Sequence, residues 1–112
     1  MTRDLKLYLD DMLKALEEIE EFMKGLSFDD FCKSTQVIRA VTMDLIIVGE
    51  AAKHVPAETR KIQPQIPWSK VVGMRNILTH NYPEADTEII WKTVKKRLPE
   101  LKPAIHELLD EH

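Results

Sequence analysis

The chain has 112 residues, of which 44% are hydrophobic and 31% charged; its formal net charge is −3 and it contains only three glycines. This length suits one domain, expected over residues 1–112, with enough apolar residues to bury a core. Few glycines favour helix over a turn-rich β fold, and the negative charge argues against a protein that coats nucleic acid with a uniformly basic surface.

The cellular compartment is indicated by three features that the sequence lacks. Cys32 is the only cysteine, so no disulfide can form within the chain, as expected in a reducing cytosol. The first residues alternate in charge and contain no apolar core of a signal peptide. No apolar run approaches the ~18 residues of a membrane span. We therefore expect a cytoplasmic protein that does not enter the membrane.

The first expected helix begins near Leu5, where Thr2 can cap its start, and ends at Gly25. Its apolar residues recur every three or four positions, the spacing of a packed helical seam. They are Leu5, Leu9, Met12, Leu16, Ile19, Met23 and Leu26. The segment Ser27–Asp30 then has the pattern of a capping box and predicts a short helical turn over residues 28–33.

The second long helix is expected from Ser34 or Thr35 to about Val55. It is apolar over much of its circumference, which predicts a central position in the fold. Gly49 lies in its interior, where glycine costs about 1 kcal/mol relative to alanine. A close contact with another helix is the preferred explanation for that glycine. Pro56 ends the helix, and residues 57–62 predict one short helical piece.

The third long helix is expected from Pro67 or Trp68 to about Asn81, because Pro83 prevents its continuation. A last helical region begins at residue 86 or 87, and Pro99 and Pro103 are expected to bend or break it. No stretch shows strand-like alternation of useful length. The sequence therefore predicts an all-α, largely up-and-down bundle of four to five helices.

The end of the third helix concentrates groups suited to phosphate chemistry. Arg75 offers a planar, permanently charged guanidinium, and His80 can accept or donate a proton near neutral pH. Asn76 can orient the imidazole or contact a ribose, and Tyr82 places a hydroxyl beside the histidine. On spacing alone, however, an arginine and a histidine at a helix end more often form a surface salt bridge and a C-terminal cap.

Helical geometry separates the two main candidates. At 100° per residue, Arg75 and His80 point about 140° apart around a straight helix. They can serve one site only if the helix frays near His80 or if a second protomer supplies part of the site.

Several segments resemble one family. Arg75, Asn76, His80 and Tyr82 match the pattern Arg-Asn-x-x-x-His-x-Tyr, which resembles the R-x4-6-H signature of HEPN domains in the form typical of their HepT-like branch. The resemblance extends over nearly the whole chain. The other segments that resemble this family are Val48-Gly49-Glu50-Ala51-Ala52-Lys53, Ile66-Pro67-Trp68, Gly73-Met74-Arg75-Asn76, Ile90-Trp91 and Leu98-Pro99-Glu100-Leu101.

The resemblance implies a helical bundle that forms a homodimer and acts as a ribonuclease toxin. It implies that Arg75 stabilises transition-state charge, His80 is the acid or base and Asn76 orients, with no metal and no cofactor. The expected partner is a minimal nucleotidyltransferase antitoxin of the MntA type, which can transfer AMP to the motif tyrosine, here Tyr82. One departure is Met43, at a position where many members have an arginine.

Residues around the motif have open interpretations. Glu50 is expected to orient Arg75 or to bond the Trp68 indole, although an exposed glutamate is about as common. Thr79 lies on the same face as Arg75 and is a second supporting candidate. The basic run 95–97 can hold RNA, but a solvated helix face is its commoner meaning.

Two other functional classes compete with the nuclease. One is a catalytically inactive HEPN subunit that binds a minimal nucleotidyltransferase, and the other is a purely structural dimeric bundle. The histidines and Cys32 show no metal-ligand spacing, so no metal is expected in any of these interpretations.

Overall fold

The computed structural model of the chain describes residues 2–80 and 87–110, and the side chains of all of these except 77–80. Six helices lie in these ranges: α1 (Arg3–Met23), α2 (Phe28–Lys33), α3 (Thr35–Lys53), α4 (Ala57–Arg60), α5 (Trp68–His80) and α6 (Thr87–Asp110). Neither range contains a strand. None of the helices described is both long and apolar enough to cross a membrane.

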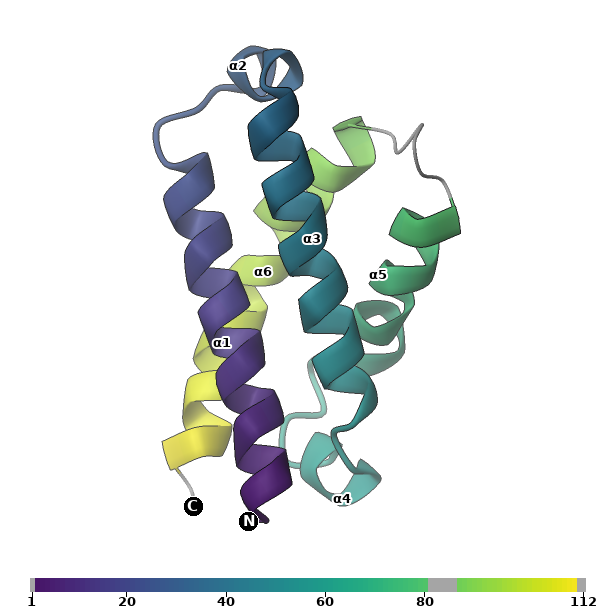
Figure 1. Ribbon diagram of the computed structural model, residues 1–112. Helices are drawn as coiled ribbons and strands as arrows, with labels where there is room; N and C mark the ends of the chain where they lie inside the picture. The colour runs from purple at the N-terminus through teal and green to yellow at the C-terminus, as the bar shows by residue number, and fades with distance from the viewer. Residues whose placement is uncertain (1, 81–86, 111–112) are drawn as a thin grey trace.

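The four long helices alternate in direction along the bundle (Figure 1). Helix α3 lies between α1 and α5 and packs on both, and α1 also packs on α6. The short helices α2 and α4 cap opposite ends, and the described ends of the chain lie together at the end that carries α4 (Figure 1). The all-α, up-and-down prediction is confirmed, with four long helices and two short ones.

The helix starts follow the capping signals in the sequence. Thr2 Oγ1 accepts a hydrogen bond from the Leu5 amide at 3.1 Å, and Ser34 Oγ accepts one from the Val37 amide at 3.2 Å. At α2 the Asp30 amide donates to Ser27 Oγ at 3.1 Å, and the Ser27 amide donates to Asp30 Oδ2 at 3.2 Å. This reciprocal pair confirms the predicted capping box. Caps of this kind each stabilise a helix by about 1 kcal/mol.

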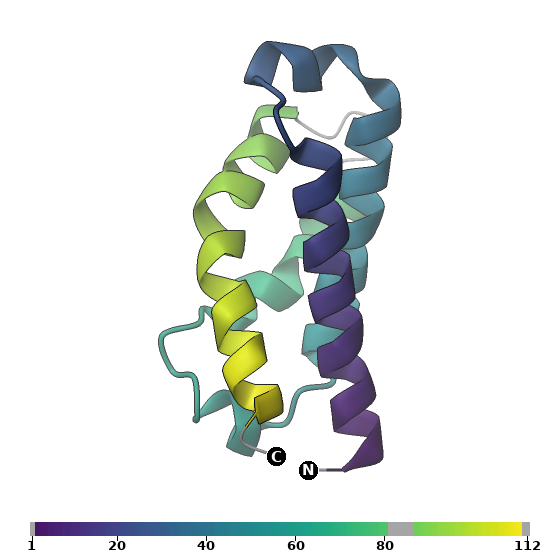
Figure 2. The ribbon, with the colours of Figure 1, turned by 90° about the vertical axis from the view of Figure 1, so that its left-hand side faces the viewer.

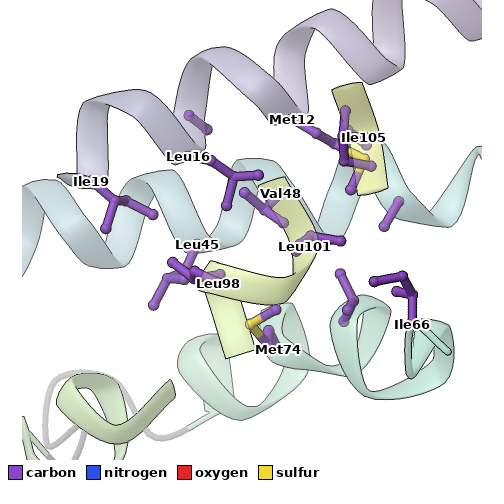
Figure 3. Close-up of a cluster of buried hydrophobic side chains, with 14 of the residues drawn as sticks. Met12, Leu16, Ile19, Leu45, Val48, Ile66, Met74, Leu98, Leu101 and Ile105 are labelled. Atoms are coloured by element: carbon purple, nitrogen blue, oxygen red, sulfur yellow. The ribbon is translucent and has the colours of Figure 1, made fainter. Parts of the chain in front are cut away.

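The core forms where the apolar seams of α1, α3 and α6 meet, with α5 closing one side (Figure 3). Leu9, Met12, Leu45 and Ile105 have no exposed surface. Fully burying a side chain of this size contributes roughly 1.5–3 kcal/mol. The three-and-four spacing seen in the sequence of the first helix therefore marks its buried face correctly.

Helix α6 continues through Pro99 and Pro103 as one element. Of the two expected effects, bending or breaking, the break does not occur, and Figure 2 shows α6 bowed along its length. Each proline removes a backbone hydrogen bond, a loss of about 3 kcal/mol in a helix interior. Burial of one face offsets that loss. Its buried residues are Ile90, Val94, Leu98, Leu101, Ala104, Ile105 and Leu108.

A carboxylate lies in the interface between α1 and α3. Asp44 is only 3% exposed, although it is charged in water at neutral pH. Burial, together with the hydrogen bond and the negative charge of Glu18 on α1, raises the pKa of Asp44 from 3.8 to about 6. The sequence contained a signal for this site, because Asp44 falls three residues after Val41 on the buried seam of α3.

Candidate active site

The start of α5 is attached to the end of α3 through two side chains. Trp68 Nε1 donates to the backbone oxygens of Arg60 at 3.2 Å and Gln63 at 3.1 Å. Arg60 in turn donates from Nε to the Val55 oxygen at 2.9 Å and from Nη2 to the Ala52 oxygen at 3.0 Å. These bonds satisfy carbonyls that the end of a helix leaves open. They fix where α5 begins relative to α3.

Helices α3 and α5 lie close together at Gly49. A Cβ at that position would lie 3.2 Å from the Arg75 amide nitrogen, 3.3 Å from Arg75 Cβ and 3.3 Å from the Val71 oxygen. Contacts this short are rarely tolerated by a real side chain, so the absence of one lets the two backbones approach. The expected close helix–helix contact at Gly49 is confirmed, and the residue it brings against α3 is Arg75.

Arg75 forms an ion pair with the residue after that glycine. Its Nε lies 2.5 Å from Oε1 of Glu50, and the two side chains are 46% and 40% exposed. This pair is consistent with the interpretation in which Glu50 orients Arg75, although the glutamate also remains partly exposed. The interpretation in which Glu50 bonds the Trp68 indole is wrong, since that indole donates to backbone oxygens. The carboxylate restrains the guanidinium while about half of the arginine side chain stays accessible to an anion.

The other residues of the motif are placed less completely. Asn76 is exposed next to Arg75. The backbone is helical through Thr79 to His80, whose side chains lie outside the described atoms, and Tyr82 lies outside the described residues. Because α5 is still helical at His80, Arg75 and His80 start from opposite sides of the helix, about 140° apart.

An exposed apolar strip on α3 leads towards Glu50. Met43 is 58% exposed and Ile47 is 38% exposed, and with Glu50 they follow the i, i+4, i+7 spacing of one helix face. The sequence showed both residues as apolar surface outside the main seam. In the ranges that the structure describes, no group of three or more His, Cys, Asp or Glu residues could hold a metal ion.

An all-α bundle whose α5 carries Arg75 and His80 with four residues between them is a HEPN-like domain. The family model described as "Ribonuclease HepT-like" matches residues 12–108. The chain belongs to the HepT-like ribonuclease family.

Two curated relatives illustrate the similarity. The chain is 40% identical over 108 residues to "Probable ribonuclease HepT" of Thermococcus cleftensis, covering 96% of this chain and 98% of that protein. It is 39% identical over 104 residues to "Putative RNase TTE0752" of Caldanaerobacter subterraneus subsp. tengcongensis, covering 93% of each chain. The comparison with solved structures found no match.

Proposed function

We propose that this protein is a metal-independent endoribonuclease. The observation that carries the proposal is Arg75, which Glu50 holds at a half-exposed position on the helix that also carries His80. Two curated relatives, each similar over more than nine-tenths of this chain, are named as a probable and a putative ribonuclease. A restrained guanidinium is suited to the charge that develops on a phosphate during cleavage.

The proposed reaction needs a base, an acid and a cation that stabilises the charge on the phosphate. The ribose 2′-oxygen loses its proton to a base and attacks the adjacent phosphorus, while the bond to the 5′-oxygen breaks and an acid protonates that oxygen. The products are a 2′,3′-cyclic phosphate and a free 5′-hydroxyl. His80 is the proposed acid or base, Arg75 stabilises the phosphorane charge, and Asn76 orients the substrate or the imidazole; Thr79 is a supporting candidate.

A homodimer is part of the proposal, because one chain supplies one motif histidine while the reaction uses both a base and an acid. The helical backbone at His80 supports it further, since it separates positions 75 and 80 by about 140° around one helix. The exposed strip of Met43 and Ile47 gives α3 an apolar surface next to Glu50. A two-fold axis close to this surface would place two copies of the motif opposite each other.

The decisive experiment is RNA cleavage in EDTA. Wild-type protein is expected to cleave single-stranded RNA at an unchanged rate after chelation, and His80→Ala is expected to lose activity by at least about a hundredfold, the typical contribution of a general acid or base. The readout is the initial rate on a labelled oligonucleotide, with the 3′ end of the product tested for a cyclic phosphate.

A second histidine substitution, outside the motif, shows whether the loss of activity is specific to His80. His106→Ala removes an exposed histidine of α6 and should leave the rate unchanged. If pure wild-type protein does not cleave RNA but binds a minimal nucleotidyltransferase, the protein is the inactive binding subunit. Met43 is 58% exposed and departs from the pattern of the family that the sequence resembles, and this departure is the feature that favours that second function.

We further propose that the protein is the toxin of a two-component system, silenced by an MntA-like nucleotidyltransferase that transfers AMP to Tyr82. Tyr82 follows His80 by two residues. An AMP group there would add bulk and a negative phosphate to the motif that contains Arg75, and so oppose the binding of RNA.

Mass spectrometry after co-expression with the cognate nucleotidyltransferase tests the modification. One or more AMP units are expected on Tyr82, and the modified protein should no longer cleave RNA. Tyr8→Phe serves as the control because Tyr8 is the other tyrosine of the chain. AMP found on a residue other than Tyr82 would refute the assignment without affecting the nuclease proposal.

A further inference from the structure

A basic cavity lies between the start of α5 and the middle of α6. Its volume is about 420 Å³. Ile66, Pro67 and Val71 form an apolar wall on the α5 side, and Lys92, Lys96 and Arg97 line it on the α6 side. The cavity is separate from the Arg75–Glu50 pair, and neither of those two residues lines it.

The charge of this cavity is opposite to that of the chain. Three cations line it against one carboxylate, Glu100, whereas the whole protein has a net charge of −3. Lys92 pairs with Glu88 one turn earlier at 2.9 Å, with both side chains more than half exposed. Among the described residues, no ion pair involves Lys96 or Arg97. The cavity therefore has the character of an anion site.

The basic run of α6 is divided between two sides of the helix. Lys95 turns away from the cavity, with its Nζ 4.7 Å from the centre of the Trp91 ring, and lines a different hollow between α1 and α6. Lys96 and Arg97 line the cavity next to α5. The sequence run 95–97 is thus not one uniform charged face, and only part of it can act with Lys92.

One side of the cavity is lined by α5, the helix that carries the candidate active site. Val71 lines it, and Arg75 lies one helical turn further along α5, about 6 Å along the helix axis and 40° around it. Beyond the cations, Ile89 is 45% exposed at the end of the cavity nearer the start of α6. The lining thus combines positive charge with apolar surface.

We propose that this cavity holds a stretch of single-stranded RNA next to the phosphate that is cleaved. The inference rests on the proposed nuclease function. Lys96 and Arg97 bind backbone phosphates, and the apolar surface of Pro67 and Ile89 contacts the ribose and base between them. A single strand fits this lining because it presents negative phosphates and flat apolar bases in alternation, which an acidic polypeptide does not.

Binding of an RNA that cannot be cleaved tests the cavity. The probe is a fluorescent single-stranded oligonucleotide with 2′-O-methyl riboses, and its dissociation constant is measured by anisotropy at several salt concentrations. Lys96→Glu is expected to weaken binding about tenfold, equivalent to 1.4 kcal/mol, and to reduce the slope of log K against log salt by about one. Lys95→Glu has the same net charge and should change binding less than about twofold.

The outcomes separate this inference from the function on which it rests. If the Lys95→Glu and Lys96→Glu proteins bind the RNA equally well and the wild-type protein cleaves RNA, the proposal that the cavity binds RNA is overturned and the nuclease proposal stands. If only Lys96→Glu weakens RNA binding but the wild-type protein does not cleave RNA, the cavity is supported as an RNA-binding site and the nuclease proposal is refuted. Binding of poly-glutamate in preference to the RNA, lost in Lys96→Glu, overturns the RNA assignment in favour of an acidic protein. Lys96→Ala replaces Lys96→Glu if charge reversal impairs folding.

Discussion

Arg75→Ala is expected to lower the rate of RNA cleavage by about a hundredfold to a thousandfold, the usual effect of removing one preorganised donor to a developing oxyanion. Glu50 pairs with the guanidinium beside α3 and so restrains it before substrate binds. The loss should fall mainly on kcat, because charge stabilisation is strongest in the transition state. The measurement is kcat and KM on a single labelled oligonucleotide.

Stability should not explain that loss. The Arg75–Glu50 pair is half exposed, and such pairs contribute at most about 1 kcal/mol. Arg3→Ala removes an exposed arginine at the start of α1 and is the matched charge control. Arg75→Lys separates charge from geometry, since lysine keeps the charge but loses the planar fork. An Arg75→Ala protein that cleaves RNA at the wild-type rate would remove Arg75 from the mechanism.

Gly49→Leu is expected to lower the free energy of unfolding by about 3 kcal/mol, at the upper end of overpacking effects. A Cβ at this position already meets the Arg75 amide nitrogen at 3.2 Å and the Val71 oxygen at 3.3 Å. These are backbone atoms of α5, so the longer side chain has to push two helices apart. Urea denaturation followed by circular dichroism measures the change, and cleavage should fall as Arg75 moves away from Glu50.

Gly73→Leu is the matched control for the same chemical change. Gly73 lies inside α5, and nothing would come within 4 Å of a Cβ there. Leucine is a better helix former than glycine by about 0.8 kcal/mol, so stability should rise slightly or stay the same. If both leucine variants unfold at the same urea concentration, the close contact at Gly49 does not restrict that position.

The helices were predictable from local signals. Thr2, Ser27 and Ser34 offer side chains that can accept from amides two or three residues ahead, and the structure uses all three. The three-and-four spacing of apolar residues in α1 depends only on helical periodicity. The continuity of α6 through Pro99 and Pro103 was not predictable in this way, because tertiary burial of the surrounding face decides it.

The candidate site was predictable in part. The motif identified Arg75. The position of Glu50 among small residues left either Arg75 or Trp68 as its partner, and only the packing of α3 on α5 shows that the partner is Arg75. The cavity that includes Lys96 could not be read from the sequence. The run of cations on α6 gave no indication that Lys95 and Lys96 line different cavities.

The buried Asp44 also affects how the protein responds to acid. Its pKa of about 6 in the folded chain exceeds the ordinary value of 3.8 expected after unfolding. Between pH 6 and pH 3.8 the folded chain retains a proton on Asp44 that the unfolded chain releases. The free energy of unfolding therefore rises as the pH falls through this interval, and Asp44 adds no further stability below it. Most paired carboxylates act in the opposite direction. Folding in mildly acidic solution is therefore coupled to proton uptake at Asp44.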